Sequence, residues 1–171
     1  MKTIYIVLFT FCTAFASAQV VNPGFETGSF SGWTTSGAIN VYTGANYLDS
    51  GILPYDGNYF AALHAGGTIW QTGLNLTAGQ TVTAYLSALL TSNNSSYLLI
   101  QKDGSAPVAI EWHPTYIFDP VFPDKYSPIS YTITESGVYS IGAENLGPYK
   151  PSQLGGGVLG VDDFTISAAG P

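Results

Sequence analysis

The chain has 171 residues, of which 9% are charged and 14% are aromatic, and its 11 acidic residues outnumber its 4 lysines, with no arginine. This length predicts a single domain. So few basic residues exclude nucleic-acid binding, which needs clustered Lys and Arg to neutralise phosphates, and they disfavour binding to anionic membranes. The 20 glycines and 10 prolines are typical of a folded, turn-rich protein.

Residues 1–18 have the layout of a secretory signal peptide. An apolar run over residues 4–15 follows a lysine, and the small residues 16–18 come next. The run is shorter than the roughly 20 residues that span a bilayer. We therefore expect a secreted protein without membrane insertion, with residues 19–171 as one mature domain. The only cysteine, Cys12, lies in the expected signal peptide, so thiol chemistry is excluded from the mature domain.

Short alternating runs between turn residues dominate the rest of the sequence. In residues 81–86, Val82 and Ala84 alternate with Thr81 and Thr83, which is the period of a half-buried strand. Strands are expected over residues 39–43, 58–64, 68–76, 81–88, 97–102, 129–134, 138–143 and 158–167. Short strands at this spacing predict an all-β fold, an antiparallel two-sheet β-sandwich.

Two segments near the ends of the mature chain resemble a known family. Residues 22–33 read Asn-Pro-Gly-Phe-Glu-Thr-Gly-Ser-Phe-Ser-Gly-Trp, and residues 160–166 read Gly-Val-Asp-Asp-Phe-Thr-Ile. The first resembles the N-terminal motif of carbohydrate-binding modules of families 4 and 9, the CenC-like modules, and the second resembles their last strand. The resemblance implies a galactose-binding-like jelly roll, a non-catalytic role and a structural calcium ion.

The paired acids of the last expected strand point independently toward a cation. Strict alternation places Asp162 on the face of Phe164, and Asp163 on the opposite face with Val161. One of the two carboxylates is therefore expected to point toward the core. An ionised group there needs a cation, hydrogen-bond donors or a bulge that re-aims it. Lysines are scarce, so we expect Ca²⁺ held by Glu26 and Asp162, with Asp163 as the alternative carboxylate. The alternative is that these acids cap turns or face water.

Aromatic residues supply candidate sugar contacts. Residues 111–126 combine Trp112 and Tyr116 with Glu111, and three prolines exclude the segment from a central strand. Ordered loops of this length commonly carry function, so we expect ligand binding there; the alternative is that the rings pack the loop onto the sandwich. By contrast, Trp33 follows two phenylalanines and is expected in the core. Further candidates are rings on expected strands: Trp70, Tyr85 and Tyr97.

The sequence contains no motif of a known catalytic site. Its two histidines, His64 and His113, lie in neither a metalloprotease nor a nucleophile motif. Any pair of its acids could form a glycosidase site, but a sequence does not give their separation. We therefore expect a protein that is not an enzyme. Sequons at Asn75, Asn93 and Asn94 indicate exposed loops, which a eukaryotic secretory pathway would glycosylate.

Two functions remain from these observations. The first is a secreted, monomeric, lectin-like module that binds a polysaccharide of a cell wall or an extracellular glycan. The second is a surface or matrix protein that uses the same sandwich for adhesion through protein contacts, without a sugar site. Binding of the mature domain to glycans distinguishes the two.

Overall fold

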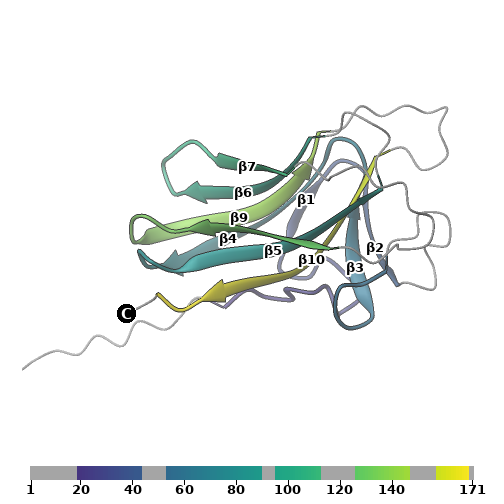
Figure 1. Cartoon of the computed structure of the whole chain (residues 1–171), viewed down its shortest axis with the longest axis horizontal. Helices are drawn as coiled ribbons and strands as arrows, with labels where there is room; N and C mark the ends of the chain where they lie inside the picture. Colours follow the sequence, from purple (N-terminus) through teal and green to yellow (C-terminus); the bar gives the residue numbers. More distant parts are fainter. Residues whose placement is uncertain (1–18, 44–52, 90–94, 113–125, 147–156, 170–171) are drawn as a thin grey trace, which may run out of the picture.

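The computed structural model describes residues 19–43, 53–89, 95–112, 126–146 and 157–169. This part of the chain forms two antiparallel five-stranded sheets that pack face to face (Figure 1). The predicted all-β, two-sheet sandwich is thereby confirmed. None of the described residues forms a helix long and apolar enough to cross a membrane. The expected signal peptide lies outside the described residues.

The strands divide between two sheets, which we call sheet A and sheet B. In spatial order, sheet A contains β1 (Thr34–Ser36), β4 (Gly67–Leu76), β9 (Gly137–Asn145), β6 (Ser96–Lys102) and β7 (Val108–Trp112). Sheet B contains β2 (Ile39–Thr43), β3 (Tyr59–Leu63), β10 (Val158–Ser167), β5 (Thr81–Leu89) and β8 (Ser127–Thr132). The expected strands are confirmed, with small differences at their ends.

Strands β1 and β7 were not expected from the sequence, and β7 corrects one interpretation. Glu111 and Trp112 end this edge strand of sheet A, so they do not belong to a loop. The prolines that argued against a strand all follow Trp112, and they do not interrupt β7.

The hydrophobic core lies between the sheets. Val82, Ala84 and Leu86 of β5 are fully buried there, as their alternation predicts. Ile69 and Ile141 bury equivalent faces of β4 and β9. Burial of each large apolar side chain stabilises the fold by about 1.5–3 kcal/mol. A second, smaller cluster lies on the other side of sheet B, formed by Phe60, Ala62 and Val158 with Tyr42 and Tyr126 against it.

Aromatic residues of the N-terminal motif close one part of the core. The ring of Phe25 lies 5.9 Å from that of Phe30 and 5.5 Å from that of Trp33, measured between ring centroids. Trp33 also contacts Phe164 of β10 at 4.7 Å, and its indole Nε1 donates a hydrogen bond to the Asn22 carbonyl. The expected core position of Trp33 is therefore confirmed.

A β-bulge interrupts β10 between Asp162 and Thr165. Asp163 has a φ of 44°, in the left-handed region that few non-glycine residues adopt. Val161 and Phe164 both pack in the core, although strict alternation would place them on opposite faces. The extra residue of the bulge breaks the strict alternation. Asp162 therefore faces the outer side of sheet B and does not share the face of Phe164, as strict alternation predicted.

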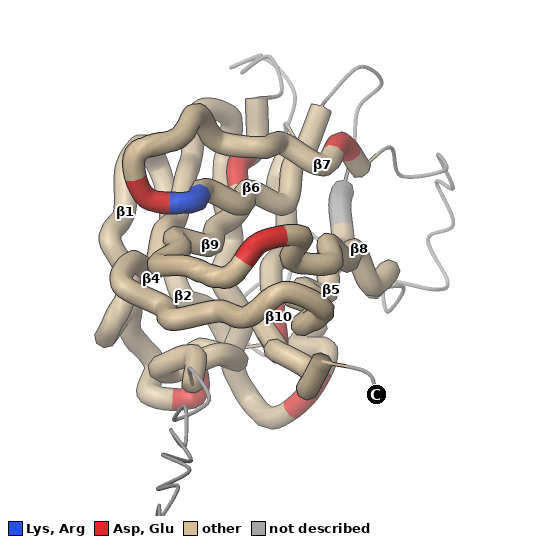
Figure 2. Tube along the Cα trace, turned by 90° about the vertical axis from the view of Figure 1, so that its left-hand side faces the viewer, with Lys and Arg blue, Asp and Glu red and all other residues tan. Residues whose placement is uncertain are grey.

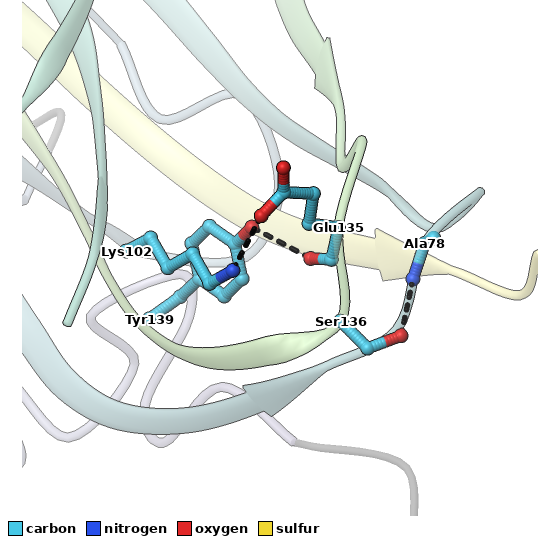
Figure 3. Close-up of polar contacts among 5 residues, drawn as sticks. All are labelled: Ala78, Lys102, Glu135, Ser136 and Tyr139. Atoms are coloured by element: carbon cyan, nitrogen blue, oxygen red, sulfur yellow. Dashed lines mark hydrogen bonds and ion pairs between the residues drawn. The ribbon is translucent and has the colours of Figure 1, made fainter. Parts of the chain in front are cut away.

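At one end of the sandwich, an ion pair joins β6 to the turn before β9 (Figure 3). Lys102 Nζ lies 2.6 Å from Glu135 Oε2, and this hydrogen bond raises the pKa of Lys102 and lowers that of Glu135. Tyr139 donates to the Glu135 carbonyl, and the Ala78 N–H donates to Ser136 Oγ. Glu135 is exposed and Lys102 is only half-buried, so solvent screens the pair and it adds little stability. Lys102 is the one Lys or Arg among the described residues (Figure 2).

Candidate functional site

On the outer face of sheet A, the side chain of Trp70 lies over a glycine. Trp70 of β4 lies opposite Thr34 of β1 and Gly142 of β9, and its neighbour Ile69 faces the core. A Cβ atom at Gly142 would lie 3.0 Å from Cδ2 and Cε3 of Trp70, so the indole passes directly over the glycine backbone. Glycine provides this space because it lacks a Cβ. Trp70 itself is half-buried.

A row of polar side chains crosses four strands beside this ring. Thr68 of β4, Glu144 of β9, Tyr97 of β6 and Glu111 of β7 lie opposite one another in register. Thr68 Oγ1 donates to Glu144 Oε1 at 3.4 Å. Tyr97 donates its hydroxyl proton to Glu111 Oε1 at 3.3 Å, and Ser95 Oγ donates to the same oxygen at 2.9 Å. We call Thr68, Glu144, Tyr97 and Glu111 the acidic row.

The chemistry of this face suits a polyhydroxylated ligand. An indole ring seated on the sheet offers apolar area for the C–H patches of a sugar ring. A carboxylate has about four acceptor directions, so Glu144 can accept sugar hydroxyls beyond its bond from Thr68. Binding sites for small ligands typically combine such an apolar surface with a few placed polar groups.

Tyr85, another candidate from the sequence, lies on the other side of the sandwich. It faces outward from β5 of sheet B, opposite Asp162. Its ring stacks on Tyr55, with centroids 3.8 Å apart and planes 15° from parallel, and Tyr126 contacts Tyr55 edge-on. A hydrogen bond with Tyr85 raises the pKa of Tyr55, and burial raises that of Tyr126. The structure therefore does not bring Tyr85 together with Trp70.

Asp162 is a buried carboxylate held by backbone donors. It is 0% exposed. Its Oδ2 accepts hydrogen bonds from the N–H groups of Tyr55 at 2.8 Å and Asp56 at 3.4 Å. Its Oδ1 accepts from Asp163 N–H at 2.8 Å. Burial raises the pKa of Asp162 to about 7, although these three bonds favour the ionised form.

Glu26 reaches the same turn from the other end of the chain. Its carboxylate accepts hydrogen bonds from the backbone N–H groups of Asn58 and Tyr59 at 3.0 Å. A Cβ at Gly24 would lie 3.3 Å from Asp162 Oδ1 and 3.8 Å from Glu26 Cγ. Gly24 therefore lies beside Asp162 Oδ1 and the Glu26 stem, whereas the Glu26 carboxylate itself lies against Gly57, where an added Cβ would meet it.

The Glu26–Asp162 pair fits calcium in ligand chemistry. Ca²⁺ takes about 6–8 oxygen ligands, and carboxylates with backbone carbonyls commonly supply them. A buried carboxylate also benefits from a nearby positive charge. No group of three or more His, Cys, Asp or Glu in the described ranges is placed to hold a metal, so carbonyls and water would complete the set. Asp163 is half-buried, and burial and Asp56 raise its pKa.

The remaining sequence candidates are placed as follows. Trp112 is 8% exposed and packs in the core between the sheets, which favours the packing alternative for this ring. Tyr116 lies outside the described residues, as do the sequon residues Asn93 and Asn94. Asn75 is exposed, as expected, but on strand β4 and not in a loop.

Three residues of the face were missed by sequence reasoning: Gly142, Glu144 and Thr68. The signal that could find them is strand register: Gly142 lies opposite Trp70, Glu144 lies opposite Tyr97, and Thr68 lies opposite Glu144. That register depends on a bulge in the β4–β9 pairing between Gln71 and Leu74, which the sequence does not reveal.

No family model and no curated protein matches this sequence. Solved structures do match. TmCBM61 in complex with β-1,4-galactotriose has a TM-score of 0.59 and 19% identity, covering 89% of this chain and 99% of that one. The chain has the fold of carbohydrate-binding modules. The CBM22-1 xylan-binding domain of Paenibacillus barcinonensis Xyn10C gives a TM-score of 0.53 and 14% identity, with coverage of 92% and 99%.

A third match comes from a longer protein. The CBM22-1 and GH10 modules of Clostridium thermocellum xylanase 10B, complexed with xylohexaose, align with a TM-score of 0.54 and 12% identity. The match covers 91% of this chain and 29% of that one. At these identities the likeness establishes the fold, and membership of families 4 and 9 stays a prediction from residues 22–33 and 160–166.

Proposed function

We propose that this protein is a non-catalytic carbohydrate-binding module and that the outer face of sheet A binds the glycan. The observation that carries the proposal is the Trp70 ring lying over Gly142 beside the acidic row. The fold supports the same function, since similar structures contain bound galactotriose and xylohexaose. A polysaccharide of a cell wall or an extracellular matrix is the ligand that we propose.

The geometry suits an extended chain that crosses the strands. A sugar ring on Trp70 would place its neighbours over β9 and β6, where Glu144 and Tyr97 lie in the adjacent row. The main aromatic anchor of an interface commonly contributes 2 kcal/mol or more, about thirtyfold in affinity. The carboxylates then fix orientation through hydroxyl hydrogen bonds.

The test compares one ring on each face of the sandwich. The mature domain is screened on a glycan array and in polysaccharide pull-downs, and affinity for the best ligand is measured by calorimetry. We expect Trp70→Ala to lower affinity at least about thirtyfold. Tyr85→Ala, on the opposite face, should leave affinity unchanged. Retention of no glycan would contradict the proposal and favour the adhesion alternative. Equal affinities of wild type and Trp70→Ala would remove the site from sheet A.

We also propose that Ca²⁺ stabilises the fold through Glu26 and Asp162, with Asp163 as the alternative ligand. When bound, the ion supplies positive charge to two carboxylates that both accept hydrogen bonds from the backbone of residues 55–59. A ligand at a hundredfold excess over its Kd adds about 2.7 kcal/mol to the free energy of unfolding. The unfolding temperature should therefore fall on chelation and recover with calcium. Identical melting curves with and without metal, in protein shown to be metal-free, would contradict this proposal.

Export and a monomeric state complete the proposal. The layout of residues 1–18 supports cleavage before Gln19. Expression of the full chain in a secreting host should release a protein whose N-terminal sequence begins at Gln19. Size-exclusion chromatography with light scattering should give the mass of one mature chain. Retention of residues 1–18 in the exported protein would contradict the assignment.

A further inference from the structure

One sequon lies on the same face of the sandwich as Trp70. Asn75, Leu76 and Thr77 form this sequon at the end of β4. Leu74 and Leu76, on either side of Asn75, both pack in the core between the sheets. Asn75 therefore points outward from sheet A, and it is exposed. A glycan attached to this residue would stand on the outer face of sheet A.

The strand register gives the separation of Asn75 from Trp70. Asn75 lies opposite Val138 of β9, and Trp70 lies opposite Gly142 of the same strand. These partners are four residues apart, so Asn75 and Trp70 are separated by roughly 14 Å along the strands. The core of an N-linked glycan contains several sugar rings in a row and is longer than this distance. Its outer sugars can therefore reach the indole.

The neighbours of Asn75 favour a path across the sheet. Of the described strands, β1 pairs with β4 only at residues 68–70, so β9 alone lies beside Asn75. On that side Val138 is an apolar side chain that is 42% exposed. Ser140 of β9 and Gln101 of β6 lie opposite each other between Val138 and Gly142, and both are half-buried. A sugar chain that leaves Asn75 thus finds apolar contact and hydrogen-bonding groups in the direction of Trp70.

We propose that Asn75 carries an N-linked glycan in a eukaryotic secretory pathway, and that this glycan lies over sheet A and shields Trp70. The donor is an oligosaccharide bound to a lipid through a diphosphate. The bond between its anomeric carbon and the diphosphate breaks, the same carbon bonds to Asn75 Nδ2, and Nδ2 loses one proton. The inference rests on the proposed export and on the proposed glycan-binding face. The attached glycan would compete with external glycan for Trp70.

The expected size of the effect follows from the tether. A ligand on a short flexible linker has a local concentration in the millimolar range. Contact of one sugar ring with one indole is weak, with a dissociation constant of the same order. Trp70 would then be shielded in about half of the molecules, which lowers the affinity for external glycan about twofold.

Mass spectrometry of protein from a secreting eukaryotic host tests the modification. We expect the peptide that contains Asn75 to carry a glycan, and enzymatic removal of the glycan should leave aspartate at this position. A second sample, with a signal peptide of the host in place of residues 1–18, keeps the result independent of the export prediction. Unmodified Asn75 in the exported protein would overturn the inference.

Oxidation by hydroxyl radicals measures shielding without a ligand. We expect Trp70 to be oxidised about twofold more slowly in the glycosylated protein than in the deglycosylated protein or in Asn75→Gln. Tyr55, which is 45% exposed on the side of sheet B, should be oxidised equally in all three. Affinity for the best glycan should rise about twofold on deglycosylation. Equal oxidation of Trp70 in all samples would overturn the shielding.

A relocated sequon separates the position of the glycan from glycosylation itself. Ser130 is exposed on the outer face of sheet B, and Ser130→Asn creates a sequon with Thr132. Combined with Asn75→Gln, it should leave the oxidation of Trp70 and the glycan affinity at their values in unglycosylated protein. Slow oxidation of Trp70 in this glycosylated variant would overturn the assignment of the effect to Asn75.

Failure of this inference is distinguishable from failure of the proposed function. Wild-type protein made in bacteria or deglycosylated by enzyme should bind external glycan through Trp70, whatever the state of Asn75 in a eukaryotic host. The proposed function fails when this unglycosylated protein retains no glycan on the array or in pull-downs. The modification and the shielding are measured by mass and by oxidation, so neither result depends on an external ligand.

Discussion

The outer faces of the two sheets use similar residues in different ways. On sheet B the outward side chains are paired with one another: Thr81 with Thr132 at 3.0 Å, Thr83 with Ser130 at 2.8 Å, and Tyr55 with Tyr85 as a stack. On sheet A the carboxylates of the acidic row also accept hydrogen bonds from their neighbours, but the Trp70 ring lies over the backbone of Gly142. A polar, aromatic sheet surface is therefore not by itself a binding surface. The two faces differ in their aromatic residues: the Tyr85 ring is stacked on Tyr55, whereas the Trp70 ring lies on a glycine.

The largest expected effect is a loss of stability on substitution of Trp112, which lies between the sheets and on neither outer face. Trp112 packs in the core, so Trp112→Ala should lower the free energy of unfolding by about 3–5 kcal/mol. Trp70→Ala should cost much less stability, because Trp70 lies outside the core. Urea unfolding of both variants measures the difference. If folded Trp112→Ala protein lost glycan affinity but kept its stability, Trp112 would be the sugar contact, and the outer face of sheet A would no longer be the binding face.

The second expected effect is a pH dependence of the free energy of unfolding, caused by Asp162, the buried acid of sheet B. The pKa of Asp162 is raised from 3.8 to about 7, so the calcium-free folded state binds more protons than the unfolded state between these values. Its contribution to stability is therefore greatest below pH 4 and is lost as pH rises through about 7. Asp162→Asn should lack this slope, and saturating calcium should oppose it. Parallel pH profiles for wild type and Asp162→Asn, measured with chelator, would contradict the expectation.

A smaller effect should follow from filling the space under Trp70. In Gly142→Ala the new Cβ would collide with the Ile69 carbonyl and with the indole. Overpacking of this kind costs about 1–3 kcal/mol, and the displaced ring should bind glycan less well. Gly104→Ala, at a turn where a Cβ meets nothing within 4 Å but φ is 73°, controls for backbone effects. Unchanged glycan affinity in Gly142→Ala would show that the position of the ring is unimportant.

The smallest expected effect on stability comes from removing one of the hydroxyl pairs on the outer face of sheet B. Thr83→Val removes the hydrogen bond to Ser130, and such cross-strand pairs contribute about 0.2–1 kcal/mol. Glycan affinity should not change. The free energy of unfolding and the affinity for the best glycan measure the two outcomes. A reduced affinity would show that the outer face of sheet B also takes part in binding.

Alternation in the sequence was enough to predict most strands and the sandwich. The residues 82, 84 and 86 of β5 show why, because each apolar residue of that run is fully buried. Strand β1 reads Thr-Thr-Ser and has no alternation to detect. Strand β7 is short and ends at Trp112, and the three prolines that follow it suggested a loop.

The site was predicted only in part, and register explains the rest. Trp70 and Glu111 were candidates by residue type, but the sequence placed them in unrelated segments. The positions of Gly142 and Glu144 depend on strand register, which one β-bulge shifts between β4 and β9, and a slip of one residue would turn them to the other face. Composition also cannot tell a core ring from one on an outer face, which is why Trp112 was preferred to Trp70 as the expected sugar contact.

The position of the last strand has a consequence for the order in which this protein folds. Strand β10 lies between β3 and β5, so without it sheet B consists of two separate strand pairs, β2–β3 and β5–β8. Asp162 of this strand also holds the turn at Tyr55 that Glu26 holds from the other side. Contacts this distant in sequence are formed slowly. During synthesis, the sandwich therefore cannot close until residues 158–167 have left the ribosome.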